Sequence, residues 1–187
     1  MTVGPEYFDD MYADDPDPWG FESRWYERRK YAVTVASLPL ERYGRAFEPG
    51  CSIGVLTELL AERVDELVAW EPHPQTAGRA AARLRSHPWV TVEEASIPDR
   101  WPEGVFDLVV LSEVAYYLDG AAFARLLERL DGGLACGGDL VAVHFDGTTD
   151  YPRSAAEVHA SLDDVVGHEP LVSHRDEGFL LDVWRRA

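Results

Sequence analysis

A short loop and the acidic residues around it are the part of the chain best suited to hold a ligand. The loop Glu48-Pro49-Gly50-Cys51-Ser52-Ile53-Gly54 follows a short apolar run, and a helical pattern starts inside it. Glycine at 50 and 54 would let the backbone approach a ligand where a Cβ would collide. Glu71 ends the next apolar run, 17 positions after Gly54. An acid at that place accepts hydrogen bonds from ribose hydroxyls, so the spacing predicts a nucleoside site.

The loop also discriminates between cofactors. A dinucleotide loop reads G-x-G-x-x-G, whereas this one reads G-x-x-x-G, with Ser52 between its glycines and Glu48 before it. A carboxylate at the strand end repels a pyrophosphate but can hold the ammonium group of an amino acid. The loop therefore favours S-adenosylmethionine (SAM) over NAD. The alternative is a tight turn between strand and helix that binds nothing.

Glu113 and His144 are the candidate catalytic residues. Glu113 comes just past the apolar run 106–111, and His144 lies near the end of the run 139–145. An amine must be neutral to attack a methyl group, and a carboxylate or an imidazole can take or hold its proton. The alternatives are that Glu113 caps the following helix and that His144 is structural. His159 lies in a predicted helix, which favours a structural role or a place in a pocket wall.

The elements that must position these residues alternate along the chain. Strands are predicted at 45–48, 66–71, 89–93, 106–111, 139–145, 171–174 and 178–184. Helices are predicted from Ser23, as N-cap, to about 38, and at 52–64, 74–86, 121–130 and 155–166. The first twenty residues, rich in proline, are expected to be extended or turning. This order predicts an α/β fold with a doubly wound, mostly parallel sheet and a C-terminal antiparallel hairpin.

Length, charge and hydropathy argue against a membrane-spanning, a secreted or a nucleic-acid-binding protein. The chain has 187 residues, 17 basic and 34 acidic, so its formal net charge is −17. That length suits one domain. No apolar run is long enough to span a membrane, and the acidic N-terminus does not resemble a signal peptide. The negative charge disfavours a nucleic-acid partner, which basic residues would bind.

Cysteine and histidine usage excludes two further kinds of site. Cys51 and Cys136 are the only cysteines, so no disulfide framework or cysteine-based zinc cluster is expected. The histidines show no metal-ligand spacing, and we expect no metal. These counts favour a reducing, cytoplasmic location. The oligomeric state is not predicted.

The order of these segments resembles the class I SAM-dependent methyltransferases, and more narrowly the nodulation-protein-S (NodS-like) subfamily. The glycine loop specifies only the class. The subfamily resemblance is carried by Asp17-Pro18-Trp19-Gly20, by Trp25-Tyr26-Glu27-Arg28-Arg29-Lys30-Tyr31 and by Phe106-Asp107-Leu108-Val109-Val110-Leu111-Ser112-Glu113-Val114-Ala115-Tyr116-Tyr117-Leu118. It implies a seven-stranded sheet, SAM as methyl donor and no metal.

The resemblance also implies roles for individual residues. The methionine end of SAM would be lined by Glu48, Gly50, Ser52 and Gly54, and the ribose bound by Glu71. The remaining cofactor contacts would come from Trp19, from Lys30 or Arg29, and from Ser96 and Ile97 over the adenine. Within a single domain, 1–187, residues 1–38 would form a lid segment and a helix. Its aromatic residues could close the site or pin the segment to the core: Tyr7, Phe8, Tyr12, Trp19, Phe21, Trp25 and Tyr26.

The leading functional hypothesis is methylation of a small-molecule acceptor. The named activity of the subfamily is N-methylation of a de-acetylated glucosamine unit in a lipochitooligosaccharide, which implies an amino sugar or related amine. The chain contains no asparagine, which excludes the N-P-P-Y motif of amide- and adenine-directed methyltransferases. Two alternatives stay open: an O-methyltransferase of a small metabolite with His144 as base, and a non-catalytic SAM-fold module. An NAD-linked oxidoreductase is more distant.

Overall fold

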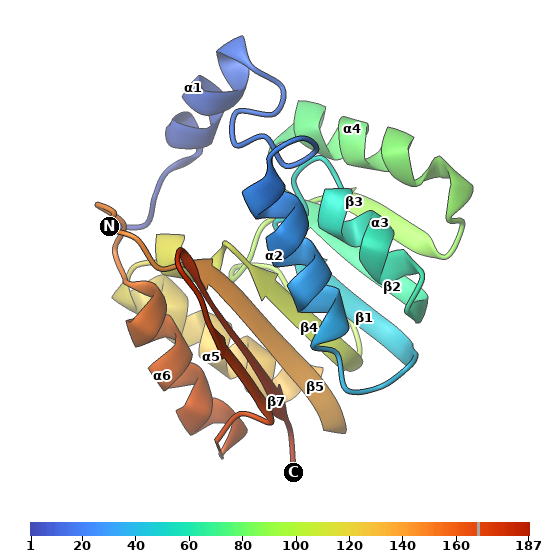
Figure 1. Ribbon diagram of the computed structural model, residues 1–187, viewed down its shortest axis with the longest axis vertical. Coiled ribbons are helices and arrows are strands. Elements are labelled where there is room, and N and C mark those ends of the chain that lie inside the picture. Colours follow the sequence, from blue (N-terminus) through green and yellow to red (C-terminus); the bar gives the residue numbers. More distant parts are fainter. Residues whose placement is uncertain (168) are drawn as a thin grey trace.

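A seven-stranded sheet runs through the computed structural model, which describes residues 1–167 and 169–187 (Figure 1). The strands are β1 (Tyr43–Pro49), β2 (Val64–Glu71), β3 (Val90–Glu94), β4 (Phe106–Ser112), β5 (Leu134–Phe145), β6 (Val172–Arg175) and β7 (Phe179–Arg185). Their order is β3-β2-β1-β4-β5-β7-β6. The first five strands are parallel to one another, and β7 is antiparallel to both β5 and β6. The predicted fold class is confirmed.

Helices cover both faces of this sheet (Figure 1). They are α1 (Pro5–Asp14), α2 (Trp25–Ala36), α3 (Val55–Ala61), α4 (Pro74–Arg83), α5 (Gly120–Gly133) and α6 (Ala155–Val166), with 3₁₀ turns η1 (Leu84–Ser86) and η2 (Ala115–Tyr117). One apolar core joins α2 and α3 to the sheet, and a second joins α5 and α6 to its other face. In the described part of the chain, no helix is long and apolar enough to cross a bilayer.

The parallel register brings four strand ends to one edge. Pro49 pairs with Trp70 near the ends of β1 and β2, and Ser112 pairs with Val143 near the ends of β4 and β5. The strand order reverses between β1 and β4, because the chain first proceeds outward to β3 and then returns to β4. Ligands of such sheets bind outside the carboxyl ends at this switch point. In Figure 1, α1 lies beyond this edge of the sheet.

Three of the local predictions that differ from the structure lie in the N-terminal third of the chain. The first twenty residues were expected to lack helix, but α1 occupies Pro5–Asp14, because proline is well suited to the first position of a helix. The N-cap of α2 is Arg24 rather than Ser23, which lies inside a turn closed on Gly20. The helix expected from Ser52 begins only at Val55, because the glycine loop runs on to Gly54.

Candidate cofactor and acceptor site

The glycine loop takes a left-handed path from β1 to α3. Gly50 and Gly54 have φ of 73° and 80°, values that favour glycine, and Ser52 between them has φ of 48°. A Cβ on Gly50 would lie 2.2 Å from Cγ1 of Val114, and one on Gly54 would lie 3.2 Å from Cα of Ala80. The two glycines therefore let the loop approach the β4–α5 connection on one side and α4 on the other.

Glu48 presents an unsatisfied carboxylate beneath this loop. Its side chain is almost fully buried, with 2% of the residue exposed. Neither Glu48 Oε2 nor the Thr57 hydroxyl has a hydrogen bond of normal geometry among the described residues. Burial raises the pKa of Glu48 to about 7. A buried acceptor without a partner is costly, so this carboxylate suits a cationic or hydrogen-bond-donating ligand.

Glu71 is held at the end of the neighbouring strand. Its Oε2 accepts a hydrogen bond from the Ser52 amide at 2.9 Å, and its Oε1 accepts one from the His73 amide at 3.0 Å. Burial raises the pKa of Glu71 to about 7. Each carboxylate oxygen has two lone-pair directions, so both can still accept a hydroxyl. The two backbone donors thus hold Glu71 beside the loop with lone pairs free to accept vicinal hydroxyls of a ligand.

The N-terminal segment crosses the whole carboxyl edge of the sheet. Its hydrogen bonds and ring contacts join Thr2 to Asp119, Tyr7 to Tyr151, Phe8 to Tyr117 and Tyr12 to Ser52. The first of these partners follow β4 and β5, on the side of the edge that includes Glu113, which we call the acceptor side, and the last belongs to the glycine loop. The segment is therefore placed where a cover over both sides would lie.

Tyr12 is the residue of this segment that contacts the glycine loop. Its hydroxyl lies 2.8 Å from Ser52 Oγ, and its ring centroid lies 5.1 Å from that of His73. Trp19, which the sequence singles out, packs edge-on against Tyr12 and stacks on Phe21. Tyr12 was one of seven aromatic residues that the sequence singled out in the segment, and its position in the sequence does not distinguish it from the others.

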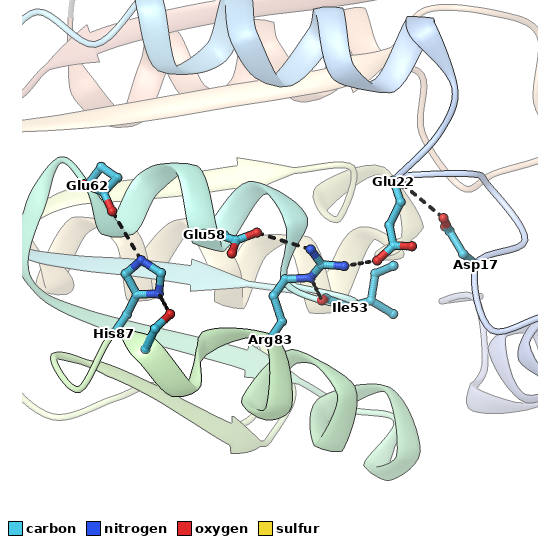
Figure 2. Close-up of polar contacts among 8 residues, drawn as sticks. Asp17, Glu22, Ile53, Glu58, Glu62, Arg83 and His87 are labelled. Atoms are coloured by element: carbon cyan, nitrogen blue, oxygen red, sulfur yellow. Dashed lines mark hydrogen bonds and ion pairs between the residues drawn. The ribbon is translucent and has the colours of Figure 1, made fainter.

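An arginine of α4 fastens the far end of the segment (Figure 2). Arg83 Nε donates to the Ile53 carbonyl at 2.9 Å, and its other nitrogens pair with Glu58 at 3.2 Å and with Glu22. One turn earlier, Arg79 donates to the Pro16 carbonyl at 3.1 Å. The same helix therefore holds both the glycine loop and the end of the N-terminal segment.

Lys30, predicted to contact the cofactor, is occupied by two carboxylates. Its Nζ lies 2.6 Å from Glu113 Oε1 and 2.9 Å from Glu27 Oε2, and only 2% of its side chain is exposed. Burial lowers the pKa of the Lys30 ammonium, but the Glu113 and Glu27 carboxylates outweigh it and raise that pKa above its usual value. Lys30 therefore joins α2 to the β4–α5 connection rather than presenting a free cation.

Glu113, the first catalytic candidate, directly follows β4 in a left-handed conformation with φ of 58°. Its Oε2 accepts hydrogen bonds from the Phe145 amide at 2.9 Å and from the Tyr116 hydroxyl, while its Oε1 faces Lys30. The alternative of a helix cap is not what the structure shows, because Asp119 caps α5. One lone-pair direction remains on Oε1.

His144, the second candidate, is fully buried and has both ring nitrogens engaged. Its Nε2 lies 3.3 Å from the Ala115 amide, and its Nδ1 lies 3.1 Å from His159 Nε2. Burial lowers the pKa of His144 well below its usual value. Because neither nitrogen is exposed, this geometry offers no free lone pair to a substrate, contrary to the expectation of a base.

Ile97 lies in the connection after β3, half-buried against the core that α5 and α6 share. Neighbouring Ser96 is exposed. Their contact with an adenine ring stays a prediction. Among the described residues, no group of three or more histidine, cysteine or acidic side chains is arranged to hold a metal ion.

Taken together, the edge has two sides. Beside the glycine loop, Glu48 Oε2 has no partner among residues 1–167 and 169–187, and Glu71 keeps free lone pairs, which fits a ligand carrying both an ammonium group and vicinal hydroxyls. Beyond Val114, Glu113 retains one acceptor direction next to a cluster of tyrosines. The arrangement can therefore hold a nucleoside with an amino-acid arm beside a second molecule.

Comparison with known proteins identifies similar chains. The family model described as Nodulation protein S (NodS) matches residues 9–142. Nodulation protein S of Rhizobium tropici is 32% identical over 134 residues, which cover 71% of this chain and 56% of that protein. The chain thus spans little more than half the length of the curated relatives that it matches first.

Two solved structures share the fold. A candidate methyltransferase from Pseudomonas syringae is 44% identical, with a TM-score of 0.77, and the match covers 87% of this chain and all of that one. The N-methyltransferase NodS of Bradyrhizobium japonicum WM9, in complex with S-adenosyl-L-homocysteine, is 24% identical, with a TM-score of 0.80 and 97% of each chain covered. The latter likeness concerns the fold alone.

Proposed function

The chain belongs to the nodulation protein S family, and from that premise we propose that it is a SAM-dependent methyltransferase of a small-molecule acceptor. The acceptor is an amine, with an amino sugar as the first candidate. The observation that carries the proposal is the buried Glu48 carboxylate, whose Oε2 has no partner among the described residues, beside a glycine loop and a nucleoside-type acid, Glu71.

Four features of the loop support a site for the cofactor. The Glu48 carboxylate would bind the ammonium of the methionine arm, and Glu71 would bind the ribose hydroxyls. Gly50 and Gly54 keep the backbone open to the ligand, and Ser52 holds Glu71 in place through its amide. When bound, SAM supplies an electrophilic methyl group on a sulfonium.

Glu113 is the proposed contact for the acceptor. Its one unused lone-pair direction, on Oε1, can accept a hydrogen bond from an N–H of the incoming amine. Such a bond orients the nitrogen lone pair toward the cofactor side, and alignment of nucleophile and methyl carbon is the largest contribution a protein makes to this transfer. The proton of the amine then leaves toward the carboxylate or water.

Residues 1–38 would act as the cover of this site within one domain, 1–187. The support is the run of contacts from Asp119 at the acceptor side to Ser52 at the glycine loop. Trp19 contributes through Tyr12, and Lys30 contributes through Glu113 rather than by direct contact with the cofactor. A cytoplasmic location and the absence of a nucleic-acid partner stay predictions.

A methyl-transfer assay tests the proposal. Purified protein is incubated with SAM carrying a labelled methyl group and with chitooligosaccharides that are either de-acetylated at one unit or fully acetylated. We expect label only in the de-acetylated sugar, with transfer lost in Glu48→Gln and kept in Glu66→Gln, an exposed residue near the opposite end of β2. Label in hydroxyl acceptors but in no amine would overturn the choice of nitrogen. No transfer to amine or hydroxyl acceptors would overturn the activity.

A further inference from the structure

Three buried side chains form a continuous hydrogen-bonded chain behind the acceptor side. Asp182 of β7 accepts from His159 of α6 at 2.5 Å between Oδ2 and Nδ1, and His159 Nε2 lies 3.1 Å from His144 Nδ1 of β5. The exposed fractions of Asp182, His159 and His144 are 1%, 3% and 0%. The chain ends on the backbone amide of Ala115, 3.3 Å from His144 Nε2. It therefore connects three elements to the first residue of η2.

Only one set of proton positions satisfies every link. The Ala115 amide is a donor, so His144 Nε2 must be unprotonated and its proton must lie on Nδ1. That proton is donated to His159 Nε2, so the proton of His159 must lie on Nδ1 and is donated to Asp182. Both histidines are then neutral and both carry the proton on Nδ1. If His144 were doubly protonated, its Nε2–H and the Ala115 amide N–H would be two donors facing each other without an acceptor.

Asp182 is well suited to fix this order. Burial raises the pKa of Asp182, but hydrogen bonds from His159 and Arg175 outweigh it and lower that pKa to about 2. The carboxylate is thus an acceptor only, and it cannot reverse the chain. The surroundings of the relay are consistent with a neutral His144, because burial first, and then His159 and Lys30, lower its pKa. Arg175 pairs with the other oxygen of Asp182.

The end of the chain lies within the acceptor side. Ala115 is two residues from Glu113 and adjacent to Tyr116, whose hydroxyl binds Glu113 and whose ring lies 5.0 Å from that of His144. The residue after His144, Phe145, donates its amide to Glu113. β5 therefore holds the β4–α5 connection at two points, one through Glu113 itself and one through the relay.

We propose that Asp182 and His159 are positioning residues that hold His144 in the tautomer accepting the Ala115 amide, and that this link fixes Glu113 and Tyr116 for the acceptor. The role in turnover rests on the proposed methyl-transfer function, whereas the tautomers and the Ala115 hydrogen bond do not. The relay contains no free base, and His144 acts through Ala115 and not on the substrate.

The wild-type protein gives the first test. Long-range proton–nitrogen correlation spectra at pH 7 report which nitrogen of each histidine carries the proton. We expect Nδ1–H for both His144 and His159, whereas isolated histidines favour the other tautomer. An Nε2–H signal from His144 would overturn the proposal, and this result requires neither activity nor a variant.

The second test uses Asp182→Asn, whose amide can donate to His159 and reverse the chain. We expect the Ala115 amide to exchange with solvent at least tenfold faster and kcat to fall at least tenfold, with the dissociation constant for S-adenosylhomocysteine within twofold of wild type. Two controls separate the relay from its surroundings. Asp163→Asn neutralises the carboxylate that accepts from Trp184 at 2.7 Å in the same α6–β7 seam and keeps an acceptor there, and Arg175→Met removes the cation that binds Asp182 Oδ1.

Both controls should leave exchange at Ala115 and kcat within about twofold of wild type. Equal exchange rates at Ala115 in Asp182→Asn and wild type, or equal losses in the controls, would overturn the relay. Faster exchange with unchanged kcat would overturn its role at the acceptor while leaving the hydrogen-bonded chain intact. If methyl transfer is absent from the wild type as well, the proposed function fails, and the spectra and exchange rates still decide the relay.

Discussion

The two sides of the carboxyl edge differ in how their charged groups are satisfied. At the ends of β1 and β2, within the described part of the chain, Glu48 has an oxygen without a partner and Glu71 receives two backbone amides. At the ends of β4 and β5, Glu113 is held by an ammonium, a phenol and an amide, and His144 has no free nitrogen. On the first side the chain leaves hydrogen-bond acceptors of its acidic residues unused, whereas on the second side the chain itself supplies the partners of Glu113 and His144.

This difference indicates that the first side binds a ligand, whereas the contacts on the second side hold the backbone and side chains in one geometry. A buried carboxylate without partners destabilises the folded chain, so its presence indicates a group that a ligand completes. A buried polar group whose partners all belong to the chain holds the chain in one geometry. Substitutions should therefore weaken ligand binding on the first side and lower the stability of the fold on the second.

The largest effect is expected from Lys30→Met, which removes the cation shared by Glu27 and Glu113. The two carboxylates would then face each other without compensation, and we expect the free energy of unfolding to fall by about 3 kcal/mol in urea titrations. Arg42→Met, which breaks an exposed pair with Asp65, is the control and should cost below about 1 kcal/mol. Equal losses of unfolding free energy in Lys30→Met and Arg42→Met would contradict a stabilising role for the Lys30 contacts.

Glu48→Gln should raise the stability of the fold, whereas Lys30→Met lowers it. Burial raises the pKa of Glu48 to about 7, so the folded state binds the proton more tightly than the unfolded state. Stability from this group is present at low pH and is lost as pH rises from about 4.5 through 7. We expect Glu48→Gln to match wild type at pH 5 and to exceed it by about 1–3 kcal/mol at pH 8. A variant less stable than wild type at pH 8 would contradict an unsatisfied carboxylate.

Glu71→Ala tests whether the side of the edge at β1 and β2 binds the cofactor. We expect it to weaken binding of S-adenosylhomocysteine at least tenfold, because two hydrogen bonds to ribose hydroxyls are lost, each worth about 1 kcal/mol. Glu66→Gln, on the same strand but exposed, should bind as wild type does. An unchanged dissociation constant in Glu71→Ala, measured by calorimetry, would remove Glu71 from the site.

The smallest effect on stability and binding is expected from removing the contacts by which Arg83 holds the end of the N-terminal segment. Arg83→Met removes the contacts with Glu22, Glu58 and Ile53 (Figure 2). Because the ion pairs are partly exposed, stability should fall by less than about 1 kcal/mol. Binding of S-adenosylhomocysteine should weaken about two- to threefold, since the glycine loop loses its carbonyl contact. Loss of binding beyond tenfold would assign Arg83 to the site itself.

The alternation of strands and helices along the chain and the glycine loop could be predicted because they depend on local patterns. Apolar runs ending in Glu48 and Glu71 specify buried strands, and glycine at 50 and 54 is required by left-handed backbone. The helix α1 was missed because the prolines at 16 and 18 restrict only the residues just before them, and not the ten residues from Pro5 onward.

The partners within the site could not be read from the sequence. Lys30 and Glu113 are 83 positions apart, and His159 and Asp182 are 23 apart, so nothing local indicates that they meet. A histidine at the end of a strand has the same pattern whether it faces a ligand or a neighbouring amide. His144 was therefore expected to be a base, and only its contacts with Ala115 and His159 reveal both nitrogens as occupied.

Calorimetric titration with S-adenosylhomocysteine at pH 6.5, in two buffers of different ionisation enthalpy, tests the central claim most directly. Because Glu48 is largely protonated at that pH and must ionise to hold an ammonium, we predict micromolar binding at one site with net release of protons. Proton release should fall in Glu48→Gln, and NAD should not bind. The absence of binding in folded protein, or equal binding of NAD, would contradict the account.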